Sequence, residues 1–314
     1  MKHFIHITDL SIEEIQETLE RTLLLKKNRT DQNSLLRNQT YGLLFYKRST
    51  RTRVSFEVGI QELGANVLAL DSQNTQISRG ESIKDTAIVL SRYLHGLVIR
   101  SHEHNVLNEF AKHASMPIIN GLTDFNHPCQ VLTDIFTLLE RYDPENVSLS
   151  VLKNKKIVFL GDTASNMANS WILASAYLDF ELVLAGPKSY EPTDEIIKKL
   201  NSDKLIPKHR FTSNPSEAVI DADVLYTDVW VSMGDEGNEN EKKAILKPYQ
   251  VNSSLMKKAC PEALFLHCLP AHVGEEVTRS VIEGPQSIIY DQAENRLHTQ
   301  KSIIAELSRL NLKY

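Results

Sequence analysis

The sequence predicts an α/β protein of two domains, each a mostly parallel β-sheet flanked by helices. Three observations indicate this class. Short apolar runs alternate with helical patterns, the runs lack polar alternation, and 314 residues suffice for about two domains. A strand that helices cover on both faces is apolar throughout, whereas a half-exposed strand alternates. The pattern therefore favours strand–helix–strand units over an all-β or all-helical fold.

The expected strands are short runs rich in Val, Ile, Leu and Phe. In the first half of the chain they are Gly42–Phe45, Val67–Leu70, Gly96–Ile99 and Pro117–Ile119. In the second half they are Ile157–Leu160, Leu182–Ala185, Val224–Thr227, Leu264–Leu266 and Ile288–Tyr290. Consecutive parallel strands need a crossover, and the helical patterns between these runs supply it.

The helices expected after these strands include Arg53–Leu63, Ser82–Tyr93, Pro128–Tyr142 and Asn166–Tyr177, with a final amphipathic helix over Ala293–Leu312. Gly64 suits the position just after the first of these helices, and Pro128 suits the first turn of the third. The polar stretch Asp143–Ser150 follows a long helix and marks a domain boundary.

Composition excludes several classes of protein. The net charge of −5 and the pI of about 6.1 give no overall attraction to nucleic acid. The acidic N-terminal stretch is unlike a signal peptide, and no apolar run approaches the roughly 18 residues of a membrane helix. The three cysteines are too few for a disulfide framework. We therefore expect a cytoplasmic protein without a membrane partner.

Ligands of open α/β sheets bind outside the carboxyl ends of the strands, so the residues that follow each strand are candidates. Ser49–Arg53 follows the first strand and leads directly into a helix, where hydroxyl and N–H groups favour an anion. Arg51 and Arg53 add planar groups suited to phosphate oxygens, and Arg100 ends another strand. The alternatives are a capped helix with solvated arginines and a surface ion pair. Together these groups favour a phosphate site.

His127 and Gln130 lie at the start of the helix that follows Pro117–Ile119. A histidine beside a helix N-terminus is biased toward the neutral imidazole, because the helix dipole disfavours a second positive charge there. Both side chains are candidates to contact a ligand, and the alternative for His127 is a structural capping role.

The second half of the chain offers different chemistry. The turn at Gly161 lacks the G-x-G-x-x-G pattern, so the sequence does not predict dinucleotide binding. Asp228, at a strand end before a glycine-containing loop, is a candidate ammonium ligand, although an ordinary exposed loop is the alternative. His267, Cys268 and His272 raise the question of zinc, but no C-x-x-C or H-E-x-x-H accompanies them and we predict no metal. The Leu269-Pro270 bond is a candidate cis peptide.

These groups indicate a small phosphorylated ligand in one domain and an amine in the other. No P-loop or clear magnesium carboxylate pair accompanies them, which argues against phosphoryl transfer. Attack of an amine on an acyl phosphate fits the inventory better.

Four motifs stand in order along the chain: Phe45-x-Lys47-x-Ser49-Thr50-Arg51-Thr52-Arg53, His127-Pro128-Cys129-Gln130, Asp228-Val229-Trp230-Val231-Ser232-Met233-Gly234 and His267-Cys268-Leu269-Pro270. On these motifs the chain resembles the aspartate/ornithine carbamoyltransferase family over essentially its whole length. The aspartate branch of that family typically carries HPTQ and HPLP and lacks the Ser-Met-Gly loop, and the N-acetylornithine branch departs from Ser-Thr-Arg-Thr-Arg. The resemblance is therefore greatest to the ornithine branch.

The resemblance implies transfer of the carbamoyl group of carbamoyl phosphate to the δ-amine of L-ornithine, without a cofactor or metal. It implies a carbamoyl phosphate domain over residues 1–142 and 291–314, an ornithine domain over residues 150–290, and two long helices that link them. It also implies a homotrimer or a multiple of trimers, with Gln76 donated by the neighbouring subunit.

Site residues carry over by motif. For carbamoyl phosphate the resemblance implies Ser49, Thr50, Arg51, Thr52, Gln76, Arg100, His127, Gln130, Cys268, Leu269 and Arg296. For ornithine it implies Asn166, Asp228, Ser232 and Met233. The residues closest to the chemistry are then Arg51, His127, Cys268 and Arg296.

Several alternatives stay open on the sequence. Putrescine is the nearest rival amine, although it lacks the α-amino and carboxylate groups that Asp228 and the Ser-Met-Gly loop would serve. A catalytically silent subunit would be expected to have lost the arginines or His127. Val273 stands where many relatives have a basic residue. The direction of use in metabolism and the acceptor of the amine proton are not decided by the sequence.

Overall fold

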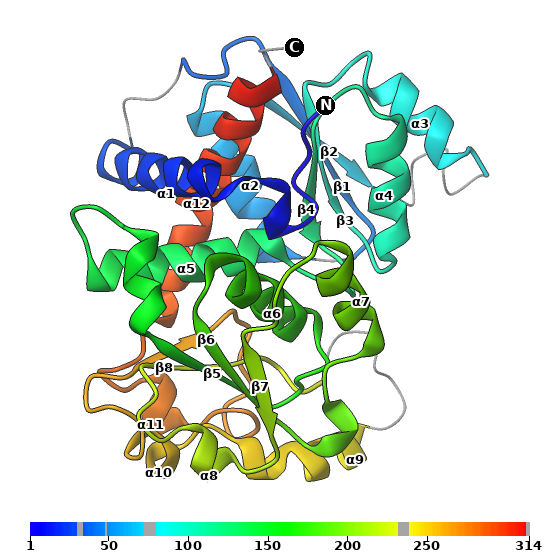
Figure 1. Ribbon diagram of the computed structural model, residues 1–314. Helices are drawn as coiled ribbons and strands as arrows, with labels where there is room; N and C mark the ends of the chain where they lie inside the picture. The colour runs from blue at the N-terminus through cyan, green and yellow to red at the C-terminus, as the bar shows by residue number, and fades with distance from the viewer. Residues whose placement is uncertain (30–33, 48, 72–79, 232–238, 312–314) are drawn as a thin grey trace. The chain divides into compact units, whose positions relative to one another are not determined.

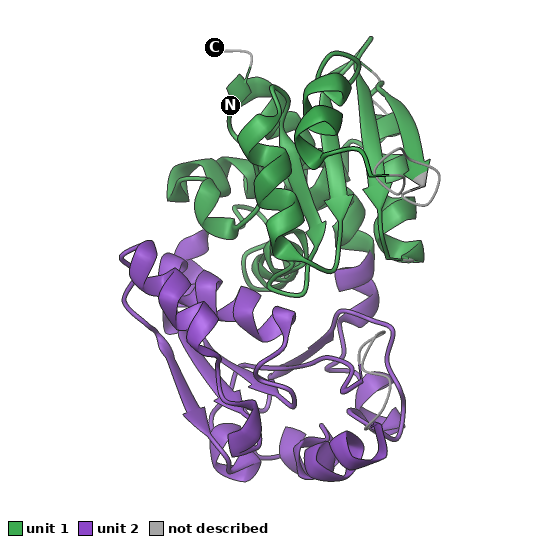
Figure 2. Cartoon of the chain, turned by 90° about the vertical axis from the view of Figure 1, so that its right-hand side faces the viewer, with its two compact units in different colours: residues 1–148, 294–314 green, residues 149–293 purple. Residues whose placement is uncertain are grey.

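The chain forms two compact units in the computed structural model, which describes residues 1–29, 34–47, 49–71, 80–231 and 239–311. Unit 1 comprises residues 1–148 and 294–314, and unit 2 comprises residues 149–293 (Figure 2). The chain passes between the units once after a long helix, at residue 148, and once within the last helix. Among the described residues, no helix is both long and apolar enough to span a bilayer.

Unit 1 contains a four-stranded parallel sheet. Its strands are β1 (Thr40–Phe45), β2 (Asn66–Asp71), β3 (Gly96–Arg100) and β4 (Ile118–Leu122), in the order β2-β1-β3-β4 (Figure 1). The register pairs Phe45 of β1 with Arg100 of β3, so the carboxyl ends of the two central strands lie side by side. The peptide segments that follow them therefore start from the same edge of the sheet.

Helices cover both faces of this sheet. They are α1 (Ile12–Lys27), α2 (Thr50–Glu62), α3 (Ile83–Leu90), α4 (His104–His113), α5 (Pro128–Tyr142) and α12 (Ile289–Asn311), with the 3-10 turn η1 (Ile7–Asp9) near the N-terminus. α3 and α4 lie together on one face, and α1, α2 and α12 lie on the other (Figure 1). Leu97, Ile99, Leu107 and Phe110 form part of the apolar core under α3 and α4.

Unit 2 contains a five-stranded parallel sheet. Its strands are β5 (Lys156–Leu160), β6 (Glu181–Ala185), β7 (His209–Thr212), β8 (Val224–Thr227) and β9 (Leu264–His267), in the order β7-β6-β5-β8-β9. Its helices are α6 (Asn166–Leu178), α7 (Asp194–Ser202), α8 (Pro215–Ala218), α9 (Glu239–Leu246), α10 (Ser253–Met256) and α11 (Arg279–Ile282), with 3-10 turns η4 (Leu149–Asn154), η5 (Lys188–Tyr190) and η6 (Lys247–Tyr249). The predicted class, two parallel α/β domains, is confirmed.

Two elements differ from the sequence prediction. β7 was not predicted, because His209–Thr212 is a partly exposed edge strand with only one large apolar residue. Ile288–Tyr290 was expected to be a strand, but α12 begins at Ile289 and only Ser287 makes a bridge, to Phe265. Ile288 and Ile289 are both buried, which gives an apolar run that resembles a short strand.

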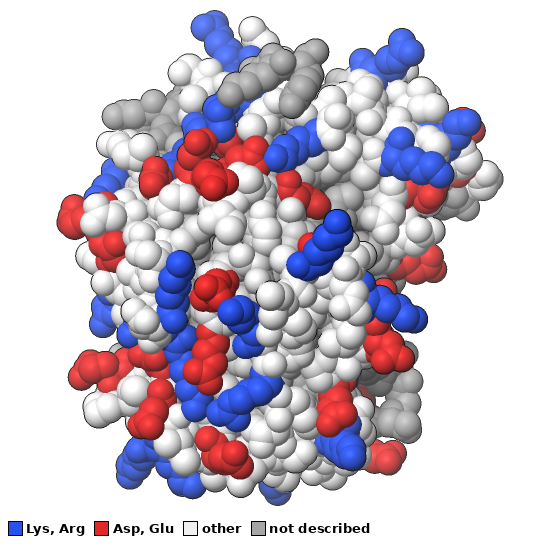
Figure 3. Space-filling view, in the orientation of Figure 1, with Lys and Arg blue, Asp and Glu red and all other residues white. Residues whose placement is uncertain are grey.

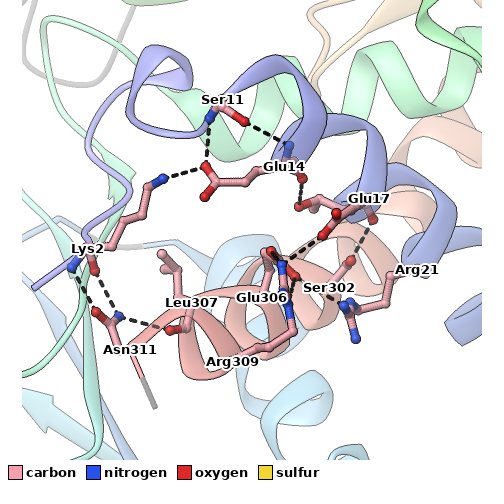
Figure 4. Close-up of polar contacts among 11 residues, drawn as sticks. Lys2, Ser11, Glu14, Glu17, Arg21, Ser302, Glu306, Leu307, Arg309 and Asn311 are labelled. Atoms are coloured by element: carbon pink, nitrogen blue, oxygen red, sulfur yellow. Dashed lines mark hydrogen bonds and ion pairs between the residues drawn. The ribbon is translucent and has the colours of Figure 1, made fainter. Parts of the chain in front are cut away.

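The N-terminal segment and the end of α12 lie against one another in unit 1 (Figure 4). The Lys2 backbone N–H donates to Asn311 Oδ1 at 2.8 Å, and Asn311 Nδ2 donates to the Lys2 carbonyl at 3.0 Å. Deeper in the same contact, the fully buried Glu306 carboxylate pairs with Arg21 at 3.1 Å and also with Arg309. A buried carboxylate with two guanidinium partners keeps its charge compensated.

Charged side chains are mixed on the face shown in Figure 3, where basic and acidic residues are interspersed and form no continuous basic patch. This distribution agrees with the net charge of −5 and offers no extended surface to a polyanion on that face.

Candidate active site

The start of α2 brings two hydroxyl groups and two guanidinium groups of unit 1 together. Ser49 caps α2 by accepting a hydrogen bond from the Thr52 N–H at 3.3 Å. The buried Thr52 hydroxyl in turn accepts hydrogen bonds from Arg100 Nη1 at 3.3 Å and from Arg296 Nη2 at 2.5 Å. Arg100 ends β3 and Arg296 lies on α12, so two guanidinium groups from distant parts of the chain meet at one helix N-terminus. The helix dipole adds to this positive potential and favours an anion.

His127, at the N-cap of α5, is buried in the same positive environment. Burial lowers the pKa of its imidazole well below the usual value, and the charges of Arg296 and Arg100 lower it further. The neutral form expected from the sequence is thus favoured, although desolvation and the two arginines, rather than the helix dipole, are the main causes. Gln130, one turn into α5, is also buried and donates to Asp134 Oδ1 at 2.7 Å.

The loop that carries His127 is held by a network that the sequence did not reveal. Asn126 Nδ2 donates to the Ile5 carbonyl at 3.2 Å and lies 2.8 Å from His6 Nδ1. Its Oδ1 accepts from Asn120 Nδ2 at 2.7 Å. The backbone of Asn126 is also paired, with Thr123. The residue directly before His127 is therefore fixed by the N-terminal segment of the chain and by β4.

Asp228 and Cys268 lie close together in unit 2, at the carboxyl ends of the adjacent strands β8 and β9. The Cys268 thiol donates to Asp228 Oδ1 at 3.0 Å, and the Val229 N–H donates to the same oxygen at 2.8 Å. Asn166 begins α6, which follows the neighbouring strand β5. The Leu269-Pro270 peptide bond is cis, as the sequence suggested. An acid, a thiol and an amide thus occur at one edge of this sheet.

A buried histidine–glutamate pair, His267 and Glu276, lies next to the Cys268 segment and bonds to its backbone. The Leu269 N–H donates to His267 Nδ1 at 2.9 Å, which leaves His267 Nε2 to donate to Glu276 Oε1 at 3.1 Å. Both side chains of this pair are fully buried. Glu276 was not among the predicted site residues, because a carboxylate nine residues after a histidine forms no recognisable sequence pattern.

Two groups in the described part of the chain offer three possible metal ligands each: Asp228, His267 and Cys268, and His272, Glu275 and Glu276. Their atoms already bond to protein partners. Cys268 pairs with Asp228, His267 with Glu276, and Glu275 with Lys243 at 2.8 Å. Several of the possible ligand atoms in both groups therefore already take part in hydrogen bonds or an ion pair within the protein.

The predicted site residues divide between the units. Unit 1 holds Ser49, Thr50, Arg51, Thr52, Arg100, His127, Gln130 and Arg296, and unit 2 holds Asn166, Asp228, Cys268 and Leu269. Gln76, Ser232 and Met233 lie outside the described residues. Thr52, Arg100, His127 and Arg296 are brought together in unit 1. Arg51 is exposed beside them.

Comparison with known proteins decides the family. Residues 2–140 match the carbamoyl-P binding domain of aspartate/ornithine carbamoyltransferase, and residues 153–307 match its Asp/Orn binding domain. The chain belongs to the aspartate/ornithine carbamoyltransferase family. The family indicated by the four sequence motifs is thus confirmed.

Relatives within this carbamoyltransferase family match almost the whole chain. The ornithine carbamoyltransferase of Methanoculleus marisnigri is 46% identical over 98% of this chain and 96% of its own length. The anabolic ornithine carbamoyltransferase of Pyrococcus furiosus is 44% identical, with 95% and 94% covered. Among solved structures, the anabolic ornithine carbamoyltransferase of Campylobacter jejuni superposes with a TM-score of 0.89 at 37% identity, covering 99% of this chain and 100% of that one.

Proposed function

We propose that this chain transfers the carbamoyl group of carbamoyl phosphate to the δ-amine of L-ornithine and releases L-citrulline and phosphate. The observation that carries the proposal is the convergence of Arg100 and Arg296 on Thr52 beside a buried, neutral His127, in a chain of this family. The relatives named ornithine carbamoyltransferase include anabolic enzymes, which supports a role in arginine biosynthesis.

In this proposal, unit 1 binds carbamoyl phosphate. Ser49, Thr50, Arg51, Thr52 and Arg100 hold the phosphate group, and Gln76 of a neighbouring subunit joins them. His127 and Arg296 donate hydrogen bonds to the carbamoyl oxygen, and Gln130 helps to orient the group. Donors already in place where negative charge develops on that oxygen stabilise the tetrahedral intermediate without further reorganisation. Cys268 and Leu269 of unit 2 are the remaining residues in the proposed carbamoyl phosphate set.

Unit 2 is proposed to bind ornithine. Asp228 pairs with the α-ammonium, and Asn166 binds the carboxylate with Ser232 and Met233. The neutral δ-amine attacks the carbamoyl carbon, so a C–N bond forms, the C–O bond to phosphate breaks, and phosphate leaves with the electron pair. Desolvation and nearby arginines lower the pKa of the attacking amine. The proton that the amine loses is taken up by the leaving phosphate, or Cys268 helps to remove it.

The decisive experiment compares amines at saturating carbamoyl phosphate. We expect rapid citrulline formation from ornithine and rates lower by orders of magnitude with putrescine and aspartate, because only ornithine carries both a δ-amine and the groups that Asp228 and Asn166 would bind. Faster turnover of putrescine than of ornithine would show that putrescine is the substrate. A folded protein that carbamoylates none of the three would contradict the proposal and indicate a silent subunit.

We further propose a homotrimer, or a multiple of trimers, in the cytoplasm. β2 is an edge strand of unit 1, and Leu68 on β2, Val54 on α2 and Val89 on α3 each expose more than two fifths of their surface. An edge strand with an exposed apolar side chain, together with exposed apolar side chains on two helices of the same unit, supports association between copies. Sedimentation should give three times the 35.6 kDa of one chain. Mixing the impaired Gln76→Ala and Arg51→Ala chains should raise the activity above that of either variant alone if a neighbour donates Gln76. A monomer would contradict the proposal.

A further inference from the structure

A lysine–aspartate pair lies at the carboxyl end of the unit 2 sheet, outside the residues assigned so far. Lys242 Nζ, on α9, lies 2.8 Å from Asp162 Oδ2, in the turn between β5 and α6. The two side chains are only 15% and 13% exposed. The Lys242 ammonium also lies 5.5 Å from the centre of the Tyr190 ring. Because both charges are largely removed from water, each depends on the other much more than in a surface pair.

The Asp162 carboxylate connects this lysine to the start of α6. Its second oxygen, Oδ1, accepts a hydrogen bond from the Ala164 N–H at 3.1 Å. Ser165 then caps α6 by accepting from the Ala168 N–H at 3.3 Å, and Asn166 is the first residue of the helix. The turn that Lys242 contacts through Asp162 therefore leads directly to Asn166, the residue proposed to bind the ornithine carboxylate.

The same turn packs against the segment that carries Asp228. Gly161 opens the turn with a φ of +119°, and a Cβ at this position would lie 3.2 Å from Trp230 Nε1. Trp230 is 2% exposed and follows Asp228 by two residues. A shift of the turn would thus disturb Asp228 as well as Asn166.

We propose that Lys242 is a positioning residue for the ornithine site, an inference that rests on the proposed function. Its ion pair with Asp162 holds the turn at residues 161–166, and its charge neutralises a carboxylate close to the expected position of the substrate carboxylate. Without Lys242, the negative charge of Asp162 would repel that carboxylate. Lys242 acts through Asp162 and needs no contact with the substrate.

α9 has a second anchor that should survive the loss of Lys242. Lys243 Nζ lies 2.8 Å from Glu275 Oε1, and this hydrogen bond raises the pKa of Lys243. The helix would therefore keep its attachment to unit 2 in a Lys242 variant. This separates the effect on the ornithine site from general unfolding.

The test is steady-state kinetics of Lys242→Met. We expect the KM for ornithine to rise about tenfold or more, which corresponds to about 1.4 kcal/mol, while the KM for carbamoyl phosphate stays unchanged. Lys242→Arg should recover most of the ornithine affinity, because it restores the charge. Thermal melts of each variant report folding independently of activity.

Lys155→Met is the matched control. Lys155 Nζ lies 2.8 Å from Asp223 Oδ1, the side chains are 25% and 21% exposed, and Asp223 also accepts from a backbone N–H. This pair lies at the amino ends of β5 and β8, at the opposite edge of the same sheet. We expect no change in the KM for ornithine from this variant.

The double variant Lys242→Met/Asp162→Asn tests the role of charge. Removing the negative charge of Asp162 should bring the KM for ornithine part of the way back from the value of Lys242→Met. The inference would be overturned by an unchanged KM for ornithine in Lys242→Met, by an equal rise of that KM in Lys155→Met, or by a parallel rise of the KM for carbamoyl phosphate. In each of these cases, citrulline formation by the unaltered chain would still uphold the proposed function. Absence of citrulline from the unaltered chain would overturn both.

Discussion

A neutral imidazole beside two guanidinium groups is the central feature of unit 1 at the scale of single residues. His127 is buried, and Arg296 and Arg100 favour its uncharged form. A neutral histidine keeps one N–H to donate to a carbonyl oxygen and does not compete with the arginines for phosphate. The electrostatics of this one region thus explain why His127 is suited to the carbonyl oxygen and the arginines to the phosphate.

Arg51→Ala should impair carbamoyl phosphate use without unfolding the protein. The side chain is exposed, so we expect a change below about 0.5 kcal/mol in the free energy of unfolding. Loss of a charge-assisted hydrogen bond to phosphate, worth about 1.5–3 kcal/mol, should lower kcat/KM for carbamoyl phosphate about tenfold to a hundredfold. Steady-state kinetics and urea unfolding measure the two effects.

Arg53→Ala is the control for this prediction. Arg53 is also exposed on α2, and its guanidinium lies 3.6 Å from Glu57 one turn later. We expect little effect on either measurement, since exposed pairs of this kind contribute at most about 1 kcal/mol. Equal losses in the two variants would show that general positive charge, and not Arg51, binds the phosphate.

At the scale of elements, the loop between β4 and α5 depends on the first residues of the chain. Asn126 and Asn120 bond to each other and both donate to the Ile5 carbonyl, so the N-terminal segment is fixed to the loop that presents His127. Buried polar networks of this kind specify one arrangement when every member is satisfied. The loop is thus ordered by contacts that are distant in sequence.

Asn126→Ala should weaken both the fold and catalysis. The substitution removes one hydrogen-bond partner each from Asn120 Nδ2, the Ile5 carbonyl and His6 Nδ1, which should lower the free energy of unfolding by about 1–3 kcal/mol. We also expect a lower kcat/KM for carbamoyl phosphate. Asn146→Ala is the control, because Asn146 makes one exposed hydrogen bond, to Asp143 at 3.0 Å. Full activity in Asn126→Ala would show that the network does not position His127.

How well the sequence predicted the secondary structure differs from one strand or helix to another. Most strands were found because buried parallel strands are continuously apolar, whereas β7 was missed because its residues are partly exposed at an edge. The family motifs indicated His127 and Cys268. They gave no sign of Asn126 or Glu276, whose roles arise from hydrogen bonds to segments that no local pattern connects with them.

In the whole molecule, several buried or partly buried histidines are held in the neutral form. Burial lowers the pKa of His3 to about 4, with a further contribution from the N-terminal ammonium. Burial and the charges of Lys301 and Lys26 lower the pKa of His298 to about 4. The pKa of His209 is lowered by burial as well. These groups take up protons near pH 6.5 only when the chain unfolds.

The free energy of unfolding should therefore fall as the pH is lowered from about 6.5 to about 4.5. In this range the unfolded chain binds protons that the folded chain excludes, so acid favours unfolding, by up to about 1.4 kcal/mol per pH unit for each such histidine. Below about 4.5, Glu14 and Glu62, whose pKa values are lowered in the fold, add to the loss.

Urea unfolding between pH 7.5 and 4.5 measures this dependence. Little change in the free energy of unfolding is expected above pH 7. His298→Gln should reduce the slope of this free energy against pH between pH 6.5 and 4.5, because the unfolded variant has one fewer histidine that binds a proton. A transition midpoint that stays constant over this range would contradict the prediction.

The contact between Lys2 and Asn311 has a consequence for the connectivity of the chain. Since hydrogen bonds join these two residues directly, positions 309 apart in the sequence lie side by side in unit 1 (Figure 4). A short peptide could join these two positions covalently, and new ends could be opened at a surface turn elsewhere. The order in which the helices and strands are synthesised would then change while their contacts in the folded protein stayed the same.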